Sequence, residues 1–133
     1  MWYVAAHTPV IQVGRNARVA AAVSICIAGF AVMLAGVISF RRAKTTVNPL
    51  KPETATALVT SGVYRYTRNP MYLGMLIVLL AWSVYLCAPV ALAGVLAFGL
   101  YIDRLQIRPE EKALAELFGT AFGDYTSRVR RWI

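Results

Sequence analysis

Residues 71–102 read MYLGMLIVLLAWSVYLCAPVALAGVLAFGLYI, a stretch of 32 positions without a charged side chain. A single α-helix of that length would extend about 48 Å, which is longer than the ~30 Å hydrocarbon core of a bilayer. Pro89 lies near the middle, and proline is tolerated at the start of a helix but not in its interior. The stretch therefore predicts a hairpin of two helices, over residues 71–86 and 90–105, joined by a tight turn.

A second apolar stretch precedes the hairpin. Residues 19–40 contain no charge, and as a helix they would extend about 33 Å, enough to cross a bilayer. Within them Ala22, Gly29 and Gly36 recur every seven residues. This stripe is either a surface for close helix packing or the ordinary small-residue content of an apolar segment. Residues 19–40 predict a third membrane-spanning helix.

The composition excludes several classes of protein. Of the 133 residues, 59% are hydrophobic and 15% are charged, where soluble domains carry about 25% charged residues. This excludes a disordered chain and disfavours a water-soluble globule. The net charge of +8 comes from basic residues that flank apolar stretches, so we expect no nucleic-acid partner. His7 is the only histidine, Cys26 and Cys87 are expected to be unpaired thiols, and no metal site is predicted.

Charge also predicts the topology. The basic clusters at residues 41–68 and 104–131 would lie on the cytosolic side, and the uncharged turn at 87–89 on the other side. The expected fold is an all-α integral membrane protein, a single domain over residues 1–133. Residues 1–18 are predicted to form an interfacial segment. A C-terminal amphipathic helix that opens at Pro109 is expected on the cytosolic face.

The hairpin brings two polar stretches to one membrane face. The first is GVYRYTRNPMYLG at residues 62–74, and the second is residues 104–125, centred on Glu110 and Glu111. One explanation is structural, because arginines flank membrane helices and carboxylates suit a helix N-terminus. The other is a pocket for a cofactor with an adenine, a ribose and a zwitterionic amino-acid end. Such a cofactor needs aromatic walls, amides, a carboxylate and a guanidinium.

Residues 58–74, LVTSGVYRYTRNPMYLG, closely resemble the signature of the isoprenylcysteine carboxyl methyltransferase and phospholipid methyltransferase superfamily. A second signature is present as Glu110-Glu111-x-x-Leu114-x-x-x-Phe118-Gly119, followed by Tyr125 and by Arg128-Val129-x-Arg131-Trp132. The resemblance covers residues 45–133, which would form the family core. It implies a small integral membrane enzyme that binds S-adenosylmethionine at the cytosolic face.

The resemblance also implies site residues. Glu111 and Arg128 are expected to act in catalysis. The residues expected to bind the cofactor are Tyr64, Arg68, Asn69, Pro70, Tyr72, Gly74, Arg108, Glu110, Glu111 and Tyr125.

The implied reaction is methyl transfer to a lipophilic acceptor that enters from the bilayer: a carboxylate, a thiol or a lipid amine. The only histidine is remote, so we expect an acceptor that is anionic or easily ionised, unless a carboxylate serves as the base. Membrane lipids are expected neighbours, a homodimer is allowed, and the expected location is a bacterial inner membrane. Two alternatives remain: an NADPH-dependent membrane reductase of the sterol-reductase type, and a non-catalytic membrane subunit.

Overall fold

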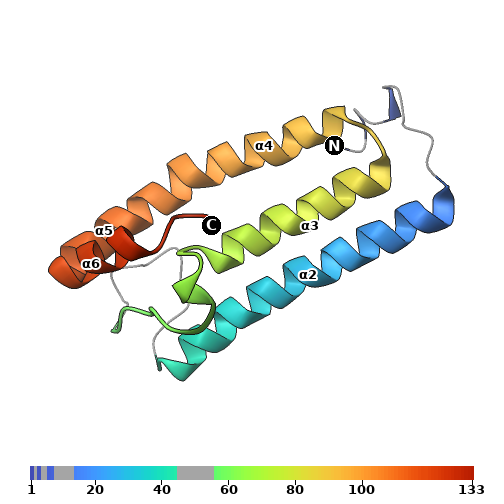
Figure 1. The fold of residues 1–133 in the computed structure, drawn as a ribbon. Coiled ribbons are helices and arrows are strands. Elements are labelled where there is room, and N and C mark those ends of the chain that lie inside the picture. The colour runs from blue at the N-terminus through green and yellow to red at the C-terminus, as the bar shows by residue number, and fades with distance from the viewer. Residues whose placement is uncertain (2, 4–5, 8–13, 45–55) are drawn as a thin grey trace.

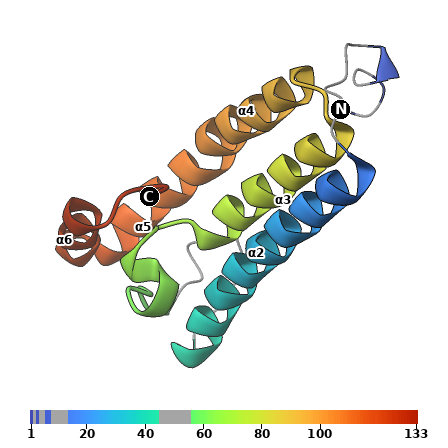
Figure 2. The ribbon, with the colours of Figure 1, turned by 45° about the vertical axis from the view of Figure 1, so that its right-hand side comes forward.

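The computed structural model describes residues 1, 3, 6–7, 14–44 and 56–133, and within these ranges the protein is helical without strands. Three long helices run side by side: α2 (Arg15–Arg42), α3 (Pro70–Leu86) and α4 (Val90–Ile102). The middle position belongs to α3 (Figures 1 and 2). The shorter elements are η2 (Gly62–Arg65), the π-helix η3 (Asp103–Ile107), α5 (Arg108–Phe118) and α6 (Thr120–Arg128). The predicted all-α fold is confirmed for the described residues.

The predicted hairpin is present, with its turn at residues 87–89. Cys87 ends α3 in the left-handed region, at φ 50°, and its N–H donates to the carbonyl of Val84 at 3.1 Å. The next helix begins directly after Pro89, whose φ of −54° is already helical. Both cysteines are free, as expected.

The small-residue stripe of α2 is a packing surface, which decides between its two interpretations. Ala22, Gly29 and Gly36 are all buried. A Cβ added at Gly29 would lie 2.9 Å from the carbonyl oxygen of Gly74 on α3, and one added at Gly36 would lie 3.2 Å from Pro70. The two helices approach this closely only because these positions lack side chains.

The predicted boundary near residue 105 is present as a change of helix type and not as a break. The second arm, α4, ends at Ile102 and α5 begins at Arg108 with Pro109 in its first turn, but η3 joins the two into one helical rod from Val90 to Phe118. Its π-helical turn, η3, directly precedes Pro109. Proline lacks an N–H and its ring would clash with the carbonyl four residues back, and the wider π turn accommodates both defects. The actual break comes at Gly119, where φ is 53°, so the C-terminal region forms two helices, α5 and α6.

Within the part of the chain that the structure describes, two helices are long and apolar enough to cross a membrane: Arg15–Arg42 and Val90–Phe118. The third, α3, is apolar but has only 17 residues. Large apolar side chains point outward from the bundle, among them Ile27, Leu34 and Leu96, which are 64%, 59% and 70% exposed. Exposed apolar surface of this extent is typical of contact with lipid or with a partner.

The N-terminal segment is described only in part. Met1 packs against Ala88 and Ala91 at the α3–α4 turn. The predicted interfacial segment over residues 1–18 includes residues 2, 4–5 and 8–13, which lie outside the described residues, as do residues 45–55 at the start of the predicted family core.

Candidate functional site

The end of the chain folds back onto the segment that leads into α3. The N–H of Arg68 donates to the carbonyl of Arg130 at 3.1 Å. The carbonyl of Arg131 accepts two hydrogen bonds, from Thr67 Oγ1 at 3.3 Å and from Asn69 Nδ2 at 3.0 Å. Thr67 and Asn69 are both buried. These contacts bring the two sequence motifs together at one end of the bundle.

A cluster of charged side chains forms where the motifs meet. The guanidinium of Arg131 donates from Nε and Nη2 to the two carboxylate oxygens of Glu111, at 3.1 and 2.6 Å, and from Nη1 to Asp103 at 2.9 Å. Arg68 contacts the same Glu111 at 3.2 Å, and Arg108 pairs with Asp103 at 3.1 Å. The hydrogen bonds to Glu111 raise the pKa of Arg131 above its ordinary value, so the guanidinium stays charged. Such bidentate, charge-assisted pairs fix geometry as well as adding stability.

The π turn explains why one arginine reaches both carboxylates. Asp103 and Glu111 are eight residues apart, which in a regular α-helix would place them about 80° apart around the axis. The extra residue of η3 reduces this to the offset of seven residues, about 20°. Asp103 was not predicted as a site residue, although it is the first charged residue after the apolar stretch. Arg131 is part of the second motif but was likewise not among the predicted site residues.

Glu110 differs from Glu111 in its contacts. Its Oε2 accepts a hydrogen bond from the hydroxyl of Tyr72 at 3.2 Å, and in the described part of the chain it forms no ion pair. Arg68, which is paired through Nη1, has a buried Nε without a hydrogen-bond partner among the described residues. Next to Glu111, which is paired with two arginines, Glu110 therefore has no ion-pair partner and Arg68 Nε has no hydrogen-bond partner in the described part of the chain.

Three predicted cofactor residues have structural contacts. Tyr64 is buried edge-on against Phe40, with ring centroids 5.3 Å apart, and its carbonyl accepts a hydrogen bond from the Tyr125 hydroxyl at 2.8 Å. Burial raises the pKa of both phenols above the ordinary value, so Tyr125 stays protonated and donates. Pro70 is fully buried in the first turn of α3, against Gly36. These residues attach α6 and α2 to the segment that carries the cluster.

The structure places three further predicted residues away from the centre of the cluster. Gly74 faces α2, so the close approach that it permits is to a helix backbone. Arg108 is exposed and reaches only Asp103, at the edge. Arg128 is exposed, and its Nε donates to a backbone carbonyl of its own helix at 3.2 Å. The predicted residues that the structure brings together are Arg68, Asn69, Tyr72, Glu110 and Glu111.

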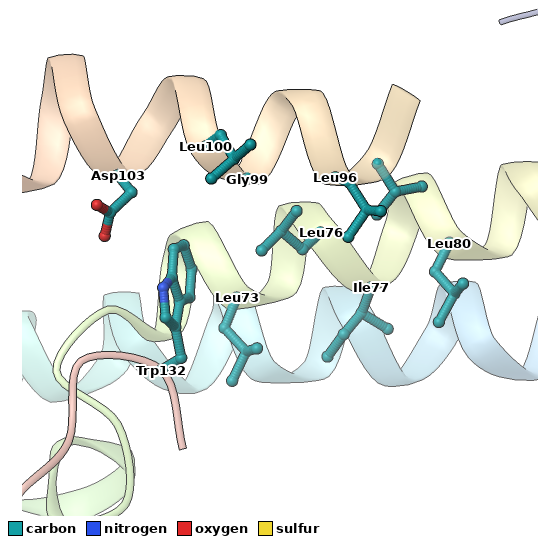
Figure 3. Close-up of a pocket in the computed structure, with 10 residues that line it drawn as sticks. Leu73, Leu76, Ile77, Leu80, Leu96, Gly99, Leu100, Asp103 and Trp132 are labelled. Atoms are coloured by element: carbon teal, nitrogen blue, oxygen red, sulfur yellow. The ribbon is translucent and has the colours of Figure 1, made fainter. Parts of the chain in front are cut away.

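An apolar groove of about 420 Å³ lies between α3 and α4 and leads to this cluster. Its walls are mainly aliphatic, with Leu73 and Leu76 on α3 and Leu96 and Leu100 on α4 (Figure 3). Asp103 and Trp132 stand at one end of it. Asp103 also pairs with Arg131, so this residue belongs both to the lining of the apolar groove and to the charged cluster.

Comparison with known proteins relates the chain to a known family. The model of the phospholipid methyltransferase family matches residues 17–121. The chain belongs to the phospholipid methyltransferase family. The predicted superfamily is therefore confirmed, and the match to this family begins within α2, ahead of the two motifs.

Several curated proteins are similar to this member of the family. Protein-S-isoprenylcysteine O-methyltransferase A of Arabidopsis thaliana is 34% identical over 106 residues, which are 77% of this chain and 52% of that protein. The mouse protein-S-isoprenylcysteine O-methyltransferase is 36% identical over 81 residues, 59% of this chain and 28% of that protein. An uncharacterized protein of Haemophilus influenzae is 43% identical over 63 residues, its whole length and 47% of this chain. The chain thus spans about half the length of the Arabidopsis relative. No solved structure matches.

Proposed function

We propose that the protein is an integral membrane methyltransferase that uses S-adenosylmethionine to methylate a lipophilic acceptor: a carboxylate, a thiol or a lipid amine. Its family and the names of its relatives support methyl transfer. The observation that carries the proposal is the groove between α3 and α4, one end of which is lined by Asp103 of the charged cluster. In the described part of the chain, Glu110 has no ion-pair partner and Arg68 Nε has no hydrogen-bond partner. An apolar chain and a charged cofactor would meet there.

The residues present fit the charged end of S-adenosylmethionine. Its amino-acid moiety carries an ammonium and a carboxylate, which require one group of each opposite charge. Glu110, without an ion pair in the described chain, would accept from the ammonium, and the unpartnered Nε of Arg68 would donate to the carboxylate. Glu111 is already held by Arg68 and Arg131, so we assign it a positioning role.

The chain would supply alignment and exclusion of water. When bound, the cofactor provides a methyl group on a sulfonium centre, which transfers by in-line displacement. The groove would orient the acceptor toward the cluster, and its aliphatic walls would keep water out. His7 belongs to the N-terminal segment, whose Met1 packs at the α3–α4 turn, the far end of the bundle from the cluster. Without a nearby histidine, an anionic or easily ionised acceptor is favoured.

The membrane placement follows from the three apolar helices. In this proposal α2 and the continuous helix Val90–Phe118 cross the whole bilayer. At 17 residues, α3 would be about 25 Å long, and local thinning of the bilayer allows it to span. The basic residues at the cluster end support an orientation in which that end lies on the cytosolic side of a bacterial inner membrane. The α3–α4 turn and the start of α2 then lie on the opposite side.

Equilibrium binding of tritiated S-adenosylmethionine tests the proposal. The purified protein should bind it in detergent and in lipid vesicles. Glu110→Gln should weaken binding at least tenfold, because a charge-assisted contact contributes about 1.5–3 kcal/mol. Glu116→Gln, an exposed glutamate of the same helix α5, is the matched control and should leave binding unchanged.

Three outcomes would contradict the proposal. The wild-type protein binds no S-adenosylmethionine in either environment; or it binds NADPH instead, which favours a reductase; or it binds neither and co-purifies with a partner, which favours a non-catalytic subunit. To find the acceptor, the protein is incubated with labelled cofactor and a membrane lipid extract. Mass spectrometry should then detect a lipid that has gained one methyl group.

A further inference from the structure

The groove between α3 and α4 has one lining residue that belongs to neither helix and comes from the C-terminal tail. Trp132, the penultimate residue, stands at the groove's end with Leu73 of α3 on one side and Asp103 of η3 on the other (Figure 3). The other described lining residues, Asp103 apart, are apolar residues of α3 and α4. The C-terminal tail therefore contributes the only aromatic ring among them, at the end that adjoins the charged cluster.

The position of this ring is held from the neighbouring residue. The carbonyl of Arg131 accepts hydrogen bonds from Thr67 and Asn69. The side chain of Arg131 is held by Glu111 and Asp103. The tail is therefore anchored to the bundle at the residue directly before Trp132, which keeps the indole near the end of the groove although it lies in an irregular segment.

The groove suits a single hydrocarbon chain. Its volume of about 420 Å³ lies in the range of small-molecule sites, about 300–1,000 Å³. Apart from Asp103 and the indole ring, the described lining offers only glycine and aliphatic side chains. Leu96 and Leu100 on its rim are 70% and 61% exposed, so the groove is reached sideways, from where lipid would lie.

We propose that the indole of Trp132 is a specificity-determining wall that limits how wide the acceptor can be next to its reacting group. This rests on the proposed function, since it takes the groove as the path of the acceptor. Trp132 and Asp103 line the groove at the end that adjoins the charged cluster, so a chain whose reacting group points toward the cluster would lie against the indole. A large rigid ring at that point admits an unbranched chain and excludes one that is branched near its polar end.

Competition binding tests the proposed role of Trp132 in the absence of cofactor and of catalytic turnover. The full chain is held in amphipol, and the fluorescence of bound cis-parinaric acid is followed while stearic acid or phytanic acid displaces it. Phytanic acid carries a methyl branch close to its carboxylate. Wild type should prefer stearic acid, and Trp132→Ala should reduce that preference about tenfold, because pocket discrimination of this kind is worth 10–200-fold. Trp132→Phe should reduce it by less.

Trp82→Ala is the matched control. Trp82 lies on α3, is 43% exposed and stacks on Tyr85, and it does not line the groove. Its replacement should leave the preference unchanged. The proposed role of Trp132 is refuted if Trp132→Ala and Trp132→Phe both keep the wild-type preference for stearic acid. It is also refuted if Trp82→Ala changes that preference as much as Trp132→Ala does, or if the wild-type protein shows no saturable binding of cis-parinaric acid. Binding of labelled S-adenosylmethionine is measured in parallel. If the wild-type protein binds no S-adenosylmethionine but still prefers stearic acid, the proposed function is refuted while the role of Trp132 in chain selectivity stands.

Discussion

Replacing Arg131 with alanine should be among the most damaging changes to the charged cluster. The substitution removes three contacts at once, two to Glu111 and one to Asp103. Each carboxylate would then keep one arginine, Arg68 for Glu111 and Arg108 for Asp103. The tail would keep its backbone hydrogen bonds to the residues before α3. We therefore expect a folded protein of reduced stability.

The size of the loss follows from burial. A charge-assisted hydrogen bond contributes about 1.5–3 kcal/mol when buried, and an exposed ion pair about 0.2–1 kcal/mol. The side chains of Arg131, Glu111 and Asp103 are 31%, 18% and 16% exposed, so the contacts fall between these limits. At about 1 kcal/mol per contact, Arg131→Ala should lower the free energy of unfolding by about 3 kcal/mol. Arg131→Lys should lower it by about half as much, because lysine keeps the charge but not the bidentate geometry.

The measurement is unfolding in mixed micelles of increasing SDS fraction, followed by tryptophan fluorescence. Arg130→Ala is the matched control, since it removes the same charge from the adjacent, exposed residue. That variant should stay within about 0.5 kcal/mol of wild type. If Arg131→Ala and Arg130→Ala lose equal stability, the cluster does not hold the tail and the reasoning is refuted.

Two further predictions separate packing residues from cofactor residues. Gly74→Ala should lower stability by about 2 kcal/mol or more, because its Cβ would lie 2.6 Å from the carbonyl oxygen of Gly29 and α2 would have to move; Gly123→Ala, which meets no atom within 4 Å, should instead stabilise α6 by about 0.5–1 kcal/mol. Thermal unfolding compares the two, and equal effects would contradict the assigned helix contact. Arg128→Ala should leave both stability and the Kd for labelled S-adenosylmethionine unchanged, since among the described residues its guanidinium bonds to a carbonyl of its own helix; a weakened Kd would show that Arg128 belongs to the site.

The sequence alone determined the helical layout and the end at which polar groups gather. An uncharged stretch too long for one span, with Pro89 near its middle, can satisfy its backbone in lipid only as two helices. The seven-residue repeat of small residues was visible in the sequence, but the structure was needed to show that this face of α2 packs on α3. These features are local, because they depend on which residues follow one another and on helix geometry. Residues 62–74 and 104–125 were recognisable for the same reason.

Tertiary structure decided which group in each polar stretch is available for chemistry. Glu110 and Glu111 are identical neighbours, and only the helical phase after the π turn gives Glu111 two arginines and leaves Glu110 with Tyr72. Arg131 reaches the cluster and Arg128 does not, because α6 ends between them and the tail turns back. Trp132 lines a groove made by helices far away in the sequence. Partner choice among equivalent side chains depends on where distant segments meet, and no local pattern encodes that position.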